Sequence, residues 1–330
     1  MDREQVGNGE IEVLEGIYVG HATGRATGVT VVLCPEGAVV GADVRGGATG
    51  TRELDPCFPG HLVERAHGIC FAGGSAFGLG AAGGVLRFLE ERGAGFPTSA
   101  GRVPIVPGAI LYDLGVGDPR ERPDAAMGYA ACEAATRQAL REGSVGAGTG
   151  ATVGKLYGME HAMKGGVGSA ATRAGELMVA AIAAVNAFGD IVDPQGGGVV
   201  AGPRLSDGSL ADTAAALGGG HRPPGFGGGT PPDPSTTLVA VLTNATLDKA
   251  AACRLAAAGS LGVARAVRPV HTRFDGDVVF ALATGRVQAP VEQVGALAAE
   301  QVSAAIVRAV RLATGLDGIP AVAELEGRSD

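Results

Sequence analysis

The 330-residue sequence predicts an α/β protein in which stacked β-sheets are covered by helices, and its length fits either two domains or one large layered domain. Strand-like and helical stretches alternate irregularly along the chain, which argues against a regular βαβ repeat. Hydrophobic residues make up 46% of the sequence, so the chain can form a large core. Its 57 glycines, accompanied by abundant alanine, indicate closely packed layers and many turns rather than disorder.

In the first half of the chain, unbroken apolar and β-branched runs predict strands. These runs lie at residues 16–22, 29–34, 38–44, 69–72 and 105–114. A turn at Glu36-Gly37 is expected to join the second run to the third. Helices are expected at residues 62–66, from the end of a glycine loop at 73–80 to residue 92, and at 123–141.

The second half of the chain contains the two most apolar strands. Residues 176–185 run directly into Asn186, and residues 237–242 have the unbroken pattern of a strand buried on both faces. Between these strands, the Gly- and Pro-rich residues 203–235 are expected to form a flexible arm. A helix is predicted to begin near Asp248, a suitable N-cap, and another to span residues 291–314. Asp275-Gly276 predicts a hairpin between residues 268–274 and 278–284.

Charge and cysteine content argue against several classes of partner and site. The net charge of −8 makes nucleic acid or an anionic membrane an unsuitable main partner. The longest apolar run, residues 177–185, is too short to cross a bilayer, and no N-terminal segment has the pattern of a signal peptide. Five scattered cysteines without a Cys-x-x-Cys pair fit a reducing cytoplasm. Neither they nor the six histidines have metal-ligand spacing, so we expect no metal and no other cofactor.

Three glycine-rich motifs each fall short of a known signature. Gly78-x-Gly80-x-x-Gly83 opens a helix, but the acidic residue expected about 20 positions later in a dinucleotide site is missing, so close packing explains it better. Residues 148–155 lack the glycine spacing and the Ser or Thr of a phosphate loop. Residues 73–77 have Phe77 in place of the last glycine of a Gly-x-Ser-x-Gly elbow. A nucleotide-binding module built on these loops is the alternative from another functional class.

The junction Ser235-Thr236-Thr237 joins the Gly- and Pro-rich arm to the start of the buried strand. A threonine at the head of a strand is ordinary by itself. If the chain were cut before Thr236, however, the new α-amine would lie within reach of the same residue's hydroxyl and serve as its base. An α-amine has a pKa of about 8, close to the pH at which a general base works. Thr236 is therefore a candidate nucleophile.

Short motifs in a fixed order carry a resemblance that covers almost the full length of the chain. They are Gly-Ile-Tyr-Val-Gly-His at 16–21, Arg-Gly-Gly at 45–47, and the stretches at 72–79, 106–113, 164–168, 236–244 and 271–284. In these motifs the chain resembles the self-cleaving L-aminopeptidase/D-esterase family, the DmpA-like N-terminal-nucleophile hydrolases. Relatives in that family include β-aminopeptidases, nylon-oligomer hydrolases and a pantetheine hydrolase.

The resemblance implies that residues 1–330 form a single domain, a four-layer αββα sandwich of the DmpA/ornithine-acetyltransferase type. It also implies a precursor cut between Ser235 and Thr236, giving an α chain (residues 1–235) and a β chain (residues 236–330) that stay associated. Relatives assemble as tetramers of such αβ units, so a homotetramer is expected. The implied activity is hydrolysis of a small peptide or amide substrate, in which Thr236 forms an acyl-enzyme and its own α-amine acts as base.

The same resemblance assigns roles to further residues. Asn186 and Tyr112 match residues placed at the oxyanion and the nucleophile. Lys155 and Asp275 match polar neighbours of the nucleophile in the nylon-oligomer branch. Gly74 and Arg273 are expected to contact the substrate.

Two positions depart from the family pattern. Relatives carry Asn or Gly before the scissile bond, where this chain has Ser235, so the sequence leaves the rate of cleavage open. Arg273 stands where relatives have Ser, Asp or Pro, and it either favours an acidic substrate terminus or points outward from the hairpin. Ornithine acetyltransferases share the fold plan and a Thr nucleophile. An acyltransferase that passes the acyl group to an amine instead of water is therefore the alternative function.

Overall fold

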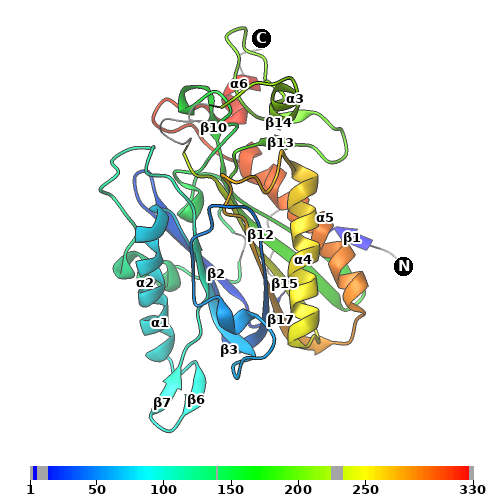
Figure 1. Cartoon of the computed structure of the whole chain (residues 1–330). Coiled ribbons are helices and arrows are strands. Elements are labelled where there is room, and N and C mark those ends of the chain that lie inside the picture. The colour runs from blue at the N-terminus through cyan, green and yellow to red at the C-terminus, as the bar shows by residue number, and fades with distance from the viewer. Residues whose placement is uncertain (1–2, 6–13, 139, 224–232, 327–330) are drawn as a thin grey trace.

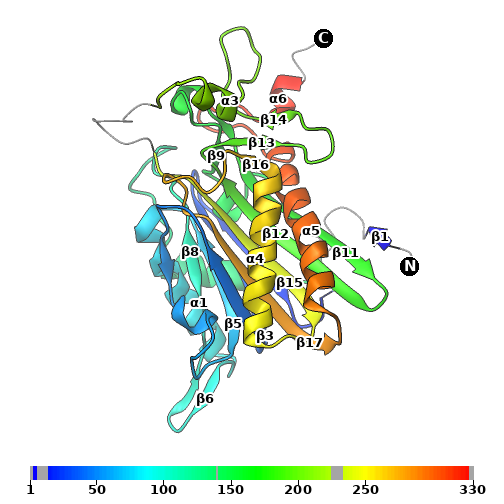
Figure 2. The same ribbon diagram turned by 45° about the vertical axis from the view of Figure 1, so that its right-hand side comes forward.

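Two β-sheets packed face to face, each covered on its outer side by two helices, form the four layers of the fold (Figure 1). The computed structural model describes residues 3–5, 14–138, 140–223 and 233–326. Helices α1 (Ala82–Glu90) and α2 (Ala125–Glu133) lie on one outer side of the sandwich. On the other side, Figure 2 shows α4 (Lys249–Ala266) and α5 (Val291–Arg311) next to each other over the sheet. The expected αββα sandwich is therefore confirmed.

The two sheets are continuous through the long strand β3, so that hydrogen bonds join ten strands in all. The strand order is β1-β11-β12-β15-β17-β3-β5-β8-β4, and β2 also pairs with β3. β12 is antiparallel to both β11 and β15, whereas β15 and β17 are parallel and are joined through α4. A parallel pair needs such a crossover because a tight turn cannot bring the chain back to the same end of the sheet. The strands are β1 (Arg3–Gln5), β2 (Tyr18–Thr23), β3 (Gly28–Val44), β4 (Thr51–Arg52), β5 (Arg65–Ala72), β8 (Gly108–Ile110), β11 (Gly166–Ala174), β12 (Leu177–Asn186), β15 (Thr236–Ala245) and β17 (Val278–Val287).

Smaller elements pack around the sandwich. β6 pairs with β7, β9 pairs with β10, and β13 pairs with both β14 and β16. Figure 1 shows the hairpin of β6 and β7 at the bottom of the molecule and α3 and α6 at the top. These elements are β6 (Phe96–Thr98), β7 (Gly101–Val103), β9 (Thr152–Val153), β10 (Met163–Lys164), β13 (Asp190–Val192), β14 (Val199–Ala201), β16 (Val267–Arg268), α3 (Thr213–Gly218) and α6 (Val322–Glu326).

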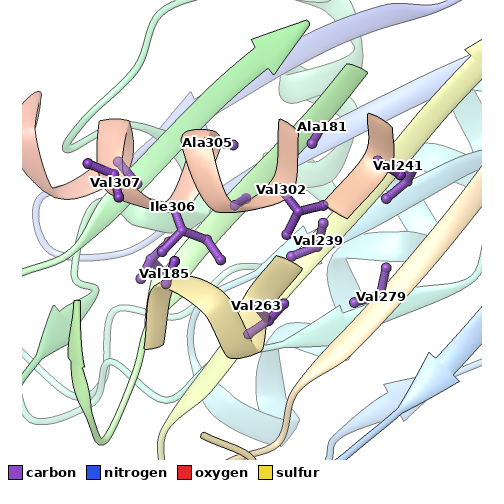
Figure 3. Packing of buried hydrophobic residues seen from close by; sticks show 14 of the residues in the cluster. Ala181, Val185, Val239, Val241, Val263, Val279, Val302, Ala305, Ile306 and Val307 are labelled. Carbon is purple, nitrogen blue, oxygen red and sulfur yellow. The ribbon is translucent and has the colours of Figure 1, made fainter. Parts of the chain in front are cut away.

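The core between the two sheets is lined by alternate residues of the central strands. In β15, Leu238 and Ala240 face this core, while Val239 and Val241 face α4 and α5 (Figure 3). All four side chains are fully buried. A strand that is buried on both faces needs an unbroken apolar sequence, so the prediction from residues 237–242 is confirmed.

β3 is one continuous strand, where the sequence predicted two strands joined by a turn at Glu36-Gly37. Its residues 29–33 pair with β5, and its residues 39–44 pair with β17. The register of pairing shifts between Leu33 and Ala38, and Gly37 has a φ of 80°. The glycine therefore forms part of a bulge that lets the strand pass from one sheet to the other instead of reversing direction.

Several other predicted elements differ from the structure. Residues 62–66 are not helical, because the chain there leads into β5, and the Leu62 side chain is exposed. Asp275-Gly276 does not close a hairpin: β17 pairs with β15 and β3, while β16 pairs with β13 in another sheet. The helix predicted at 123–141 ends at Glu133, and the strand at 105–114 is limited to β8. Within the predicted flexible arm the structure forms α3, and residues 224–232 lie outside the described residues.

Close packing of α1 on α2 requires a glycine just after the 78–83 motif. A Cβ atom at Gly84 would lie 1.8 Å from the Ala125 carbonyl oxygen, whereas a Cβ atom at Gly83 would meet nothing closer than the Ala125 Cβ at 3.9 Å. Within the motif, Gly78 also has no room for a Cβ, but Gly80 has open space. The packing interpretation therefore holds for only part of the motif.

We expect Gly84→Ala to lower the free energy of unfolding by about 1–3 kcal/mol through overpacking. Gly83→Ala is the matched control in the same helix and should raise it by up to about 1 kcal/mol, because alanine favours the helix over glycine. Urea denaturation of both variants measures the difference. Equal effects on stability would show that the contact with α2 does not decide which residue is tolerated.

Candidate active site

The antiparallel pair of β12 and β15 brings Asn186, the last residue of one strand, opposite Thr236, the first residue of the other. Asn186 is fully buried, and Thr236 is 2% exposed. Hydrogen bonds along the rest of both strands fix the position of these two end residues. The candidate nucleophile and the candidate oxyanion residue, 50 positions apart in the sequence, therefore lie side by side.

The peptide bond between Ser235 and Thr236 joins two buried residues, of which Ser235 is fully buried. The Thr236 hydroxyl donates to the Ser235 carbonyl oxygen at 2.5 Å. The Gly276 backbone N–H donates to the same oxygen at 2.7 Å. Two donors on one carbonyl oxygen polarise the carbonyl group and favour attack at its carbon.

Lys155 connects the two sides of the site and is 3% exposed. Its ammonium donates to the Asn186 carbonyl oxygen at 3.2 Å, to Asn186 Oδ1 at 2.9 Å and to the Ser235 hydroxyl at 3.1 Å. An ammonium has three N–H donors, which matches these three acceptors. Burial lowers the pKa of Lys155 to about 8, an effect that nearby carboxylates, Asp275 first, oppose.

Asp275 is 1% exposed and anchors the backbone that carries Gly276. Its carboxylate accepts from the Phe188 N–H at 3.1 Å and from the Thr272 N–H and hydroxyl at 2.9 and 2.5 Å. Burial, followed by the Asp277 carboxylate, raises the pKa of Asp275 to about 6. Through these hydrogen bonds Asp275 holds the segment whose Gly276 N–H contacts the Ser235 carbonyl oxygen.

Asp277 and His271 are site residues that the sequence analysis did not assign. The Asp277 carboxylate accepts from the Thr237 N–H at 2.6 Å and lies 2.8 Å from His271 Nδ1. It thereby fixes the backbone directly after the candidate nucleophile. Both residues fall in the motif at 271–284, so a signal was present. The composition of the Asp-Gly-Asp triplet favours a tight turn, and the family resemblance assigns a role only to its first residue, Asp275.

Lys164 is a second buried lysine to which the sequence analysis gave no role. It is fully buried, and its ammonium donates to the carbonyl oxygens of Thr149 and Ala151, both at 2.7 Å. Burial lowers the pKa of Lys164 to about 7. The next residue of this loop, Thr152, donates its N–H to Asn186 Oδ1 at 2.9 Å. Lys164 therefore holds the loop that orients the Asn186 amide.

Asp233 and Ser235, shortly before Thr236, both contact residues of the site. Asn186 Nδ2 donates to the Tyr112 carbonyl oxygen at 3.0 Å, so its amide is engaged there. The Tyr112 phenol lies beside Asp233, and burial together with that carboxylate raises the pKa of Tyr112. Tyr112, Lys155 and Asp233 also line one small cavity. The structure therefore brings Tyr112, Lys155, Asn186 and Asp275 together around the Ser235–Thr236 bond.

The two residues expected to contact substrate lie at the border of this region. Arg273 is exposed, and its guanidinium lies 4.9 Å from the centroid of the Phe274 ring. Gly74 has a φ of 77°, and its N–H donates to Asp113 Oδ1 at 2.6 Å. Asp113 lines the same cavity as Tyr112. Substrate contact by Arg273 or Gly74 stays a prediction.

The described residues offer neither a metal site nor a membrane-spanning helix. In the described ranges, no three His, Cys, Asp or Glu side chains are grouped so that they could hold a metal ion. None of the helices in the described part of the chain combines the length and apolarity that crossing a bilayer requires. The five cysteines are free thiols, four of them buried.

Comparison with known proteins gives a family and several relatives. The family model described as Peptidase family S58 matches residues 10–322. An uncharacterized aminopeptidase of Mycobacterium leprae (strain TN) is 41% identical over an alignment 348 residues long, and the alignment covers 93% of this chain and 91% of that protein. A 6-aminohexanoate-oligomer endohydrolase of Kocuria sp. (strain KY2) is 31% identical over 286 residues, which cover 83% of this chain and 75% of that protein.

Solved structures share the fold. A Burkholderia sp. beta-aminopeptidase matches with a TM-score of 0.68 at 22% identity, covering 99% of this chain and 95% of that one. The L-aminopeptidase D-Ala-esterase/amidase of Ochrobactrum anthropi, described as a variant of the Ntn-hydrolase fold, matches with a TM-score of 0.69 at 17% identity, covering 97% and 90%. The fold is therefore of the Ntn-hydrolase type, as the resemblance implied. Because the family match spans most of the sequence, the chain belongs to peptidase family S58 and is a hydrolase of peptide or amide bonds.

Proposed function

We propose that the protein is a self-processing N-terminal-nucleophile amidohydrolase, in which Thr236 attacks first its own chain and then a small peptide or amide substrate. One observation carries this proposal. The Thr236 hydroxyl and the Gly276 N–H both donate to the Ser235 carbonyl oxygen, at 2.5 and 2.7 Å. A nucleophile, the bond to be cut and a donor for the developing negative charge are thus assembled before the reaction, as acyl transfer requires.

Self-processing would proceed in two balanced steps. In the first, Thr236 Oγ1 attacks the Ser235 carbonyl carbon, a C–O bond forms and the peptide C–N bond breaks. The hydroxyl proton passes to the departing Thr236 nitrogen, which becomes an α-amine. In the second step, water hydrolyses the ester, leaving a carboxyl group on Ser235 and restoring the Thr236 hydroxyl. The products are an α chain of residues 1–235 and a β chain of residues 236–330.

Turnover would use the α-amine that processing releases. This amine takes the hydroxyl proton as Thr236 Oγ1 attacks the substrate carbonyl, since its pKa of about 8 suits a general base. The protonated α-amine then gives this proton to the substrate nitrogen as the C–N bond breaks, so the amine half leaves as a neutral amine. Water hydrolyses the remaining ester, which releases the acyl half as a carboxylic acid and restores the Thr236 hydroxyl. Asn186 would donate to the oxyanion. Lys155 and Asp275 would set the protonation and the orientation of the Thr236 amine. This role is supported by their contacts with the preceding residue, because the Lys155 ammonium donates to the Ser235 hydroxyl and Asp275 forms a β-bridge with Ser235.

Intact-mass spectrometry and N-terminal sequencing of the purified protein test self-processing. We expect one mass for residues 1–235, a second for residues 236–330, and Thr-Thr-Leu-Val as the start of the smaller chain. A single uncut mass after long incubation would contradict the proposal. Release of p-nitroaniline from aminoacyl anilides by the processed protein tests the hydrolytic half.

The rate of self-processing is expected to peak between about pH 6 and pH 8, the pKa values of Asp275 and Lys155. Below pH 6 the Asp275 carboxylate takes up a proton and loses part of its capacity to accept from Thr272 and Phe188. Above pH 8 Lys155 becomes a neutral amine with two donors for three acceptors. Precursor made by cell-free synthesis and moved to buffers between pH 5 and pH 9 gives the profile from the fraction left uncut.

Asp275→Asn is the control for the acid side of this profile, because an amide does not titrate there. The variant should lose the fall in rate below pH 6 while keeping the fall above pH 8. A wild-type profile that is flat from pH 5 to pH 9 would show that neither group governs processing. The uncut chain has no α-amine on Thr236, so that amine does not contribute to the alkaline side.

We also propose a homotetramer of αβ units in a reducing, cytoplasmic compartment. The compartment is supported by the five free thiols. Size-exclusion chromatography with light scattering gives the number of αβ units. A monomeric unit would contradict the tetramer without affecting the proposed chemistry.

A further inference from the structure

The backbone of Phe274, Asp275 and Gly276 runs alongside Ser235 like a neighbouring strand. The Ser235 N–H donates to the Phe274 carbonyl oxygen at 2.8 Å, and the Gly276 N–H donates to the Ser235 carbonyl oxygen at 2.7 Å. Ser235 and Asp275 form a parallel β-bridge. The residue on the acyl side of the scissile bond is therefore held by two backbone groups, one on each side of its α-carbon.

This backbone segment is itself held firmly. The Asp275 carbonyl oxygen accepts from the Ala48 N–H at 2.9 Å, and the Asp275 carboxylate accepts from Phe188 and Thr272. Gly276 is also the residue type that the position requires. A Cβ atom there would lie 2.5 Å from the Ala48 carbonyl oxygen and 3.0 Å from Thr236 Oγ1. The absent side chain thus lets the Gly276 N–H approach the reacting carbonyl.

We propose that residues 274–276 form the edge that recognises the acyl half of the substrate, with the Gly276 N–H as an oxyanion donor and the Phe274 carbonyl as acceptor for the substrate nitrogen. The Ser235 carbonyl oxygen that accepts from Gly276 becomes the oxyanion when Thr236 attacks its carbon. A substrate that takes the place of Ser235 on Thr236 would meet the same two groups. This inference rests on the proposed function, because it takes Thr236 as the nucleophile of both reactions.

The substrate class follows from what Ser235 presents to this edge. Its nitrogen lies one carbon from the scissile carbonyl, so the acyl half is an α-amino acid residue with an N–H for the Phe274 carbonyl. Its side chain is fully buried, and the hydroxyl accepts from the Lys155 ammonium at 3.1 Å. Little room is left for a larger side chain. Glycyl, alanyl and seryl amides are therefore the expected substrates.

The processed enzyme tests this with p-nitroanilides that differ in one feature at a time. Alanine p-nitroanilide carries the nitrogen, propionyl p-nitroanilide is the same acyl group without it, and leucine p-nitroanilide has a larger side chain. We expect kcat/KM to fall by about tenfold or more when the nitrogen is removed, because the Phe274 carbonyl is then left without its donor. The leucine compound should also be poorer than the alanine compound. Equal hydrolysis of all three would overturn the inference and leave the proposed hydrolase intact.

Self-processing supplies a second measurement that needs no added substrate. Ser235→Pro removes the N–H that donates to Phe274, whereas Ser235→Ala keeps it and removes the hydroxyl. We expect Ser235→Pro to be cut more slowly than Ser235→Ala by about tenfold or more, with circular dichroism confirming that both fold. Equal rates of cutting in the two variants would overturn the inference.

Each of the two measurements can test the inference when the other cannot be made. If Ser235→Pro does not fold, the anilide series decides, and if no anilide is hydrolysed, the ratio of processing rates decides. A wild-type chain that is never cut would instead contradict the proposed function itself.

Discussion

Replacing Thr236 with alanine is expected to leave one uncut chain of 330 residues, with neither self-processing nor amide hydrolysis above background. The substitution removes the hydroxyl that donates to the Ser235 carbonyl oxygen. Without the cut no α-amine forms, so the proposed base is lost together with the nucleophile. Removing the nucleophile of a comparable hydrolase lowers kcat by about a million-fold. Gel electrophoresis, intact mass and anilide hydrolysis follow the two losses.

Thr237→Val is the matched control for this variant. Thr237 is the next residue of β15 and is equally buried, and its hydroxyl has no hydrogen-bond partner among the described residues. Valine keeps its shape and its backbone N–H, so we expect two chains cut at the same bond. Two chains from Thr236→Ala, or an uncut chain from Thr237→Val, would show that the attacking hydroxyl has been assigned to the wrong residue.

The elements that the sequence predicted well are those in which local pattern and tertiary environment agree. β12 and β15 are unbroken apolar runs, and both are buried on both faces. α4 begins where its N-cap was expected, and the Asp248 carboxylate accepts from the Ala251 N–H at 2.7 Å. Such elements carry their own signal, because burial demands apolar residues and an N-cap demands a side-chain acceptor.

The predictions that failed concern pairing between distant segments. Glu36-Gly37 and Asp275-Gly276 both have turn composition, yet the first is a bulge inside β3 and the second supports the active site. In each case the partner strand that decides the conformation is more than 25 residues away: β5 for one, and the Ser235 segment for the other. Turn composition permits a reversal of the chain but does not say which strands will pair.

A similar division applies to the candidate site. Thr236 was predicted from the junction of the arm with the strand, and Lys155, Asn186 and Asp275 from the family resemblance. The structure adds groups that have no side-chain signature, above all the Gly276 N–H and the Phe274 carbonyl. Every residue has a backbone carbonyl and every residue except proline has a backbone N–H, so only the folded chain shows which of these groups reaches Ser235.

Asn186→Asp is expected to lower turnover by about 100-fold or more, the usual effect of losing an oxyanion donor. Aspartate keeps the Oδ1 acceptor that Thr152 and Lys155 use, each at 2.9 Å in the native protein. It replaces the Nδ2 donor with a second carboxylate oxygen, which repels the negative charge that develops during attack. Asn186→Ala also removes the donor, but it leaves the Thr152 N–H and the Lys155 ammonium short of an acceptor.

The comparison of turnover with self-processing makes this variant informative. In the uncut chain the Asn186 amide donates to the Tyr112 carbonyl oxygen, while the Gly276 N–H donates to the scissile carbonyl. Processing should therefore fall less than turnover in Asn186→Asp, and Asn186→Ala should follow the same order with lower thermal stability. Anilide hydrolysis measures turnover, the uncut fraction over time measures self-processing, and thermal unfolding measures stability. Near-normal turnover in both variants would remove Asn186 from the oxyanion site and leave the Gly276 N–H as the donor for both reactions.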